Sequence, residues 1–139
     1  LLYNVSIGYR QPLNPDNSGY LGFVTGFDIV RSTDSPDFEM SFWEIGLTYD
    51  QALSKKSDAI NGYRIMMGLD ASVWMPQNNR KGDLIVAKPS LIFNLTQNIG
   101  FEFNGLVFLS ERTVQTGSTA PDSYTFGKLG YGVKAYVQF

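Results

Sequence analysis

The sequence contains neither cysteine nor histidine among its 139 residues. The lack of cysteine excludes disulfide bonds, thiolate metal sites and cysteine nucleophiles. The lack of histidine excludes the serine–histidine and cysteine–histidine pairs of nucleophilic catalysis, and it excludes histidine-based zinc sites. We therefore predict no catalytic residue, no metal and no cofactor, and we expect that the protein is not an enzyme.

Long apolar runs and a basic surplus are missing as well. No stretch approaches the about 18 consecutive apolar residues of a transmembrane helix, which argues against a helical membrane protein. The formal net charge of -2 leaves no excess of lysine and arginine for phosphates, so we predict no nucleic-acid partner. Residues 1–139 suffice for a single domain. The chain opens within a strand pattern and no signal peptide precedes Leu1, so we expect a mature or trimmed chain.

What the sequence does contain is alternation of apolar and polar side chains, which is typical of β-strands. Polar segments separate the alternating stretches, and the longest of them, Thr113–Thr125, is expected to be the most mobile loop. Proline cannot donate to a strand ladder, so we expect a bulge or a local break at Pro89. The pattern predicts seven strands: Leu1–Arg10, Tyr20–Val30, Phe38–Tyr49, Tyr63–Met75, Leu84–Leu95, Phe101–Leu109 and Leu129–Phe139.

The two faces of these strands differ in chemistry. The odd-numbered face is apolar and rich in aromatic residues, whereas the even-numbered face carries glycines and charges. A soluble lipocalin-like barrel or sandwich would bury the odd-numbered face, and alternation alone does not decide which side is inside. Aromatic residues near strand ends, such as Trp43, Tyr49 and Tyr63, favour a transmembrane barrel with the odd-numbered face against lipid. The strand lengths agree with the roughly 9 to 11 residues that cross a bilayer.

In a membrane barrel the even-numbered face would line the lumen, where buried charges are tolerated when they are paired. The near balance of signs on this face favours ion pairs over a pair of carboxylates for acid–base catalysis. We predict that the lumen network consists of Arg10, Asp28, Glu44, Arg64, Asp70, Lys88, Glu102 and Lys134.

The last nine residues form an alternating strand that ends on an aromatic residue. Its apolar face consists of Tyr131, Val133, Ala135, Val137 and Phe139. This strand resembles the targeting signature of bacterial outer-membrane β-barrels, and the whole chain is similar in pattern to small barrels of the OmpA, OmpX and OmpW type. The resemblance implies a Gram-negative outer membrane, contact with its lipid, and recognition of the terminal strand by the barrel assembly machinery. Outer-membrane phospholipases, palmitoyl transferases and lipid A deacylases rely on histidine, and the chain departs from those families.

We therefore expect an all-β, antiparallel, up-and-down transmembrane β-barrel. Bacterial single-chain barrels have even strand numbers, so the seven predicted strands imply an eight-stranded barrel that lacks its first strand, or one piece of a larger barrel. The expected role is structural, adhesive or interaction-based, with a protein partner at the loops. Two alternatives remain open: a small porin-like pore or transporter for small or hydrophobic solutes, and a soluble lipocalin-like ligand-binding barrel.

Overall fold

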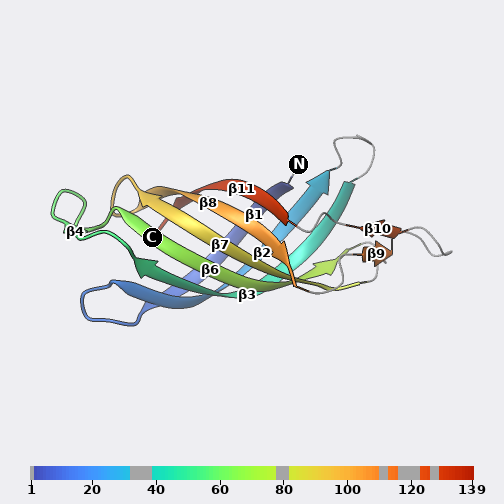
Figure 1. Cartoon of the computed structure of the whole chain (residues 1–139), viewed down its shortest axis with the longest axis horizontal. Coiled ribbons are helices and arrows are strands. Elements are labelled where there is room, and N and C mark those ends of the chain that lie inside the picture. The colour runs from blue at the N-terminus through green and yellow to red at the C-terminus, as the bar shows by residue number, and fades with distance from the viewer. Residues whose placement is uncertain (1, 32–38, 78–81, 110–112, 116–122, 126–128) are drawn as a thin grey trace.

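The computed structural model describes residues 2–31, 39–77, 82–109, 113–115, 123–125 and 129–139, and all regular structure among them is β. Two short hairpins pair β4 (Lys56–Ser57) with β5 (Gly62–Tyr63) and β9 (Thr113–Gln115) with β10 (Ser123–Thr125) (Figure 1). Seven long strands form one antiparallel sheet, in the order β1 (Leu2–Pro12), β2 (Gly19–Arg31), β3 (Glu39–Ala52), β6 (Ile65–Pro76), β7 (Leu84–Asn94), β8 (Ile99–Phe108) and β11 (Leu129–Val137). The predicted all-β antiparallel class is confirmed.

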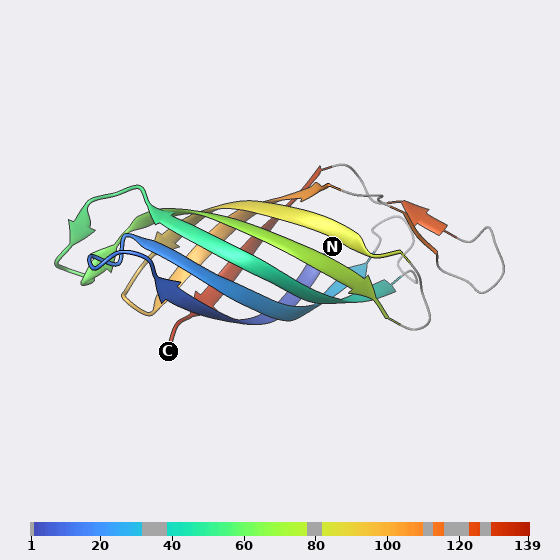
Figure 2. The same ribbon diagram turned by 90° about the horizontal axis from the view of Figure 1, so that it is seen from below.

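Each strand of the large sheet pairs with the long strand that precedes or follows it along the chain, which is up-and-down topology. The sheet curls through 210° into a half-barrel and does not close (Figure 2). Its two edges are β1 and β11. Among the residues described, no helix is long and apolar enough to cross a membrane.

The predicted strands correspond to the seven long strands, with differences at their ends. β3 continues three residues beyond the predicted end at Tyr49, and β11 ends at Val137, two residues before the chain does. The stretch predicted as the longest loop holds β9 and β10, while residues 116–122 lie outside the described part of the chain. Leu1 lies outside it too.

The expected irregularity at Pro89 takes one of its two predicted forms. The β7–β8 ladder is interrupted at Lys88 and Pro89, but Ala87 faces Val107 and Ser90 faces Asn104, so the register is the same on both sides. No residue is inserted, and the predicted bulge is therefore absent. Proline is tolerated here because a ladder interrupted on one side needs no donor from it.

The curl places the two faces of the sheet in different surroundings. Along β3, buried and exposed residues alternate from Met40 to Asp50, with the even-numbered residues inside. The odd-numbered residues form a convex outer surface of large exposed apolar side chains, among them Ile7, Trp43, Ile45, Leu69, Phe103 and Val133.

Glycine on the inner face permits the strong curl. A Cβ atom on Gly46 would lie 2.6 Å from the Cβ of Ser72 and 2.7 Å from the carbonyl oxygen of Ala71 on the neighbouring strand β6. A larger residue would push these two strands apart at this position. The inner-face glycines predicted from the sequence thus belong to the curvature of the sheet.

Candidate functional site: the interior of the half-barrel

The interior holds an ion pair with a hydrogen-bonded network around it, and the residues of this network come from four strands. The ammonium group of Lys88 on β7 binds the carboxylate of Glu44 on β3, and the Glu44 side chain is fully buried. Asn4 on β1 donates from its amide nitrogen to Asp28 on β2 at 2.8 Å and to Glu44 at 3.2 Å. Strand pairing sets this arrangement, because Asn4 and Asp28 face each other in the β1–β2 register.

A second set of charges lies farther along the interior. The guanidinium of Arg10 lies 2.7 Å from the carboxylate of Asp50. Lys134 on β11 faces Glu102 on β8, and Asp70 on β6 faces Lys88 across the ladder. Asp50, Asp70 and Glu102 are all buried. Each of these three carboxylates therefore lies beside a cation or faces one across the ladder or on a neighbouring strand.

Seven of the eight residues predicted for the lumen network point into the interior. Arg64 does not join them, because it is exposed and lies just before β6 begins. Asp50 and Asn4, which were not included in the predicted network, take part in it. The alternation itself marked Asp50 as inward-facing, and only its partner was unknown.

One end of the interior is apolar, which the description of the even-numbered face as glycine and charge missed. Trp74 packs against Phe42 and Phe108, with ring centroids 5.6 and 6.1 Å apart. The buried cluster consists of Met40, Phe42, Trp74, Leu84, Val86 and Leu106, with Val30 and Phe108 packed against it. These residues lie near strand ends at even-numbered positions. Apolar side chains on both faces of the same strand end could therefore have predicted the cluster from the sequence. The cluster occupies this end of the interior.

The opposite end of the interior opens into a cavity of about 330 Å³. Its lining includes Ile60, Met66 and Ile92, which are buried. Polar groups surround it, among them Asp16, whose pKa is lowered by hydrogen bonds from the Ser18 side chain and backbone. The hydroxyl of Tyr136 donates to the side-chain carbonyl of Asn94 in the same wall. The interior of the half-barrel thus has a cavity at one end and the apolar cluster at the other.

The residues predicted to form the assembly signal lie on the outer surface. Tyr131, Val133, Ala135 and Val137 are exposed on β11, as is Leu129, and Phe139 follows the strand and is fully exposed. None of them packs inside the half-barrel. This stripe is therefore available for contact with an apolar partner outside the protein.

Comparisons with known proteins add no relative. No family model matches the chain, and no significant match was found among curated proteins or solved structures. The two faces of the sheet are accordingly the features from which function is inferred.

Proposed function

We propose that this chain forms the wall of a non-enzymatic β-barrel in a bacterial outer membrane. The observation that carries the proposal is the sidedness of the curled sheet, with charges buried inside and large apolar side chains exposed outside. A soluble ligand-binding barrel has the opposite arrangement, because water stabilises charged groups on its outer surface and its apolar residues line the cavity. Contact with lipid stabilises the apolar convex surface seen here.

The outer surface has the length and composition for this role. The long strands contain 9 to 14 residues, and tilted strands of roughly 9 to 11 residues cross the hydrocarbon core. Trp43 and Phe27 make an edge-to-face contact on β3 and β2, with ring centroids 5.6 Å apart. Aromatic residues of this kind form belts at the interfaces of membrane barrels.

The filled interior favours a structural or interaction role over transport. The apolar cluster obstructs one end, and the Lys88–Glu44 pair fills the middle. A partner would then meet the connections at the clustered end, which join β2 to β3, β6 to β7 and β8 to β11. This end carries the longest connection, between Phe108 and Leu129, as expected of extracellular loops.

We expect that the reconstituted protein will not conduct ions across a planar lipid bilayer. The physical reason is that the buried apolar cluster around Trp74 and Phe42 occupies one end of the interior and opposes the entry of hydrated ions there. Single-channel recording measures this directly, and a variant with Phe42→Gly and Trp74→Gly serves as the control for an unblocked interior. Regular conductance steps in the unmodified protein would favour the alternative function, a pore for small solutes.

Deletion of Phe139 is expected to lower the outer-membrane yield in cells sharply and to affect refolding in detergent much less. Phe139 makes no buried contact, so its loss leaves the packing of the sheet intact while removing the aromatic terminus that the assembly machinery is proposed to read. Heat-dependent gel mobility of the refolded protein, measured beside the yield in cells, separates these effects. Phe139→Tyr keeps an aromatic side chain at the terminus, so it is the matched control and should retain most of the yield. Deletion of Leu13, another exposed apolar residue, would not serve as a control because it shortens the connection between β1 and β2. Equal losses in both assays would show that Phe139 acts through packing.

A further inference from the structure

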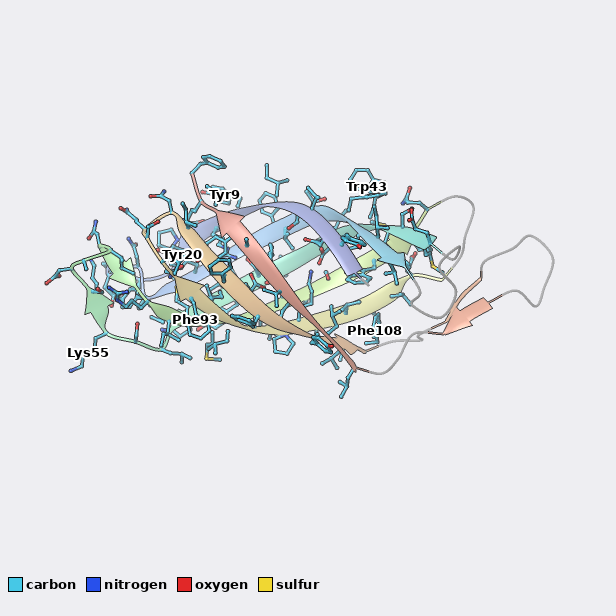
Figure 3. All side chains as sticks on the ribbon, turned by 90° about the horizontal axis from the view of Figure 1, so that it is seen from above. Tyr9, Tyr20, Trp43, Lys55, Phe93 and Phe108 are labelled. Atoms are coloured by element: carbon cyan, nitrogen blue, oxygen red, sulfur yellow. The ribbon has the colours of Figure 1, made fainter. Side chains whose placement is uncertain are left out.

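In the proposed membrane location, on which this inference rests, the open side of the half-barrel would leave backbone groups without hydrogen-bond partners. β1 and β11 each have a single neighbour in the sheet, and they flank the opening through which the inner face of the sheet is seen in Figure 3. Every second backbone N–H and C=O of such a strand points away from its neighbour. Hydrocarbon offers these groups no hydrogen bonds, so the edges need partners within the membrane.

The direction of the edge strands limits what the partner is. Seven consecutive antiparallel strands leave the first and the last running in the same direction. Direct pairing of β1 with β11 would make a parallel seam in an otherwise antiparallel sheet. A second copy in the same membrane orientation would also set its β11 parallel to β1, at two seams. Antiparallel closure instead requires an odd number of strands between the edges.

The curvature of the sheet then indicates how many strands lie between β11 and β1. Seven strands make six steps, so 210° corresponds to about 35° for each step. The remaining arc of about 150° takes about four such steps, which three additional strands supply. A single additional strand would have to turn the sheet by about 75° at each of its two steps. The count of eight expected from the sequence therefore fits this curvature less well than a count of ten.

Burial inside the half-barrel falls toward the open side. The inward residues of the central strand β6, from Met66 to Trp74, are all buried, as are those of its neighbour β3 from Met40 to Asp50. The inward residues of the edges, such as Asn4 and Arg10 on β1 and Lys134 and Tyr136 on β11, are only partly buried. The interior next to the edges thus lacks the wall that the central strands have.

The charges indicate what the missing wall carries on its inner side. The inward residues of the described strands include five carboxylates, Asp28, Glu44, Asp50, Asp70 and Glu102, and three cations, Arg10, Lys88 and Lys134. Asp28 is buried, and its Oδ2 atom accepts no hydrogen bond from the described part of the chain. Asn4 on the edge strand β1 is its cross-strand neighbour. A cationic side chain on a strand beside β1 would be close enough to balance this acid.

We propose that three further antiparallel strands of the same polypeptide fill the open side, complete a ten-stranded barrel, and present a lysine or arginine to Asp28 from the strand beside β1. The same polypeptide is the source because every pair of neighbours in this sheet consists of consecutive long strands of the chain. The three strands alternate as the visible ones do, with apolar residues toward lipid.

The test is a set of distances across the open side, measured by electron spin resonance on the complete gene product in lipid vesicles. One spin label replaces Ile7, in the middle of β1, and the other replaces Tyr131, Val133 or Val137 on β11; all four side chains are outward. Four strand spacings amount to about 19 Å and two to about 10 Å. The shortest of the three distances is expected to match four spacings.

Internal controls calibrate both values on the described sheet. The register connects Ile7 to Thr25, Ile45, Val73 and Ile85 in turn, so the Ile7–Ile45 pair spans two steps and the Ile7–Ile85 pair spans four. Agreement with Ile7–Ile85 supports the proposal, and agreement with Ile7–Ile45 overturns it in favour of one strand. A disulfide between cysteines at positions 7 and 133 would show direct closure. A distance lost on dilution with unlabelled protein would show that a second copy supplies the wall, and either result overturns the proposal.

Asp28→Asn in the complete gene product tests whether a lysine or arginine on the strand beside β1 pairs with Asp28. Loss of a paired carboxylate is expected to reduce the folding equilibrium constant at least tenfold, because the cation opposite is left unpaired. Unchanged or increased stability would mean that no cation faces Asp28. Failure of the labelled parent to enter vesicles contradicts the membrane proposal itself, whereas insertion with a different distance contradicts the strand count alone.

Discussion

Replacing Lys88 with methionine is expected to destabilise the folded protein by about 3 to 5 kcal/mol, the cost of leaving a buried carboxylate without its partner. Glu44 is fully buried, and after the substitution Asn4 would still donate to its carboxylate but no ammonium group would neutralise it. Glu44→Gln is expected to cost less, because Lys88 retains Asp70 opposite it on β6. Removing both charges should recover much of the loss, since no unpaired charge then remains.

Urea unfolding of the protein in lipid vesicles measures these changes as a double-mutant cycle. Lys56→Met is the matched control, because Lys56 is exposed in the β4–β5 hairpin and its substitution should change stability by no more than about 0.5 kcal/mol. Strictly additive losses for Lys88→Met and Glu44→Gln would contradict a direct buried pair. They would mean that both side chains are hydrated, as in an open channel.

Ile45→Arg is expected to cost about 2 to 4 kcal/mol in lipid vesicles, the penalty for arginine on the lipid-facing side near the midplane of a barrel. Ile45 is exposed on the outer surface near the middle of β3, the longest strand. In aqueous solution the same substitution would place a charge in water and would be nearly neutral. The size of the effect in lipid therefore reports which side of the sheet contacts the membrane.

Leu53→Arg provides the matched control for Ile45→Arg. Leu53 is also an exposed aliphatic residue, but it lies immediately after the end of β3, where the penalty should fall to about 0 to 1 kcal/mol. The free energy of unfolding of each variant is compared with that of the parent in the same vesicles. Equal costs at the two positions would contradict a membrane that spans the middle of β3.

The strands and the direction in which their side chains point could be predicted because alternation with a period of two directly reflects strand geometry. The same alternation placed Glu44, Asp70 and Lys88 on one face, where the structure finds them. It could not tell that Lys88, and not Arg64, pairs with Glu44, because pairing depends on the stagger of β3, β6 and β7 and not on local sequence.

The apolar cluster was not predicted, and the open side was expected as a missing strand or a missing piece of a larger barrel without its extent. Phe42, Trp74 and Val86 lie on three strands, and only the register brings them to the same level of the interior. The curl of the sheet depends on inner-face crowding at positions such as Gly46, which a pattern of apolar and polar letters does not encode. Closure is a property of the whole ring of strands, so no single strand reveals it.

The two tryptophans offer the most direct test of the central claim, which is that the apolar convex face of this sheet contacts lipid. Trp43 points outward and is 49% exposed, whereas Trp74 is inside and 1% exposed. Trp74→Phe leaves Trp43 as the sole reporter, and Trp43→Phe leaves Trp74. In vesicles of brominated lipid, we expect strong quenching of Trp43 emission and little quenching of Trp74 emission. Quenching of neither residue, or of Trp74 alone, would contradict the account.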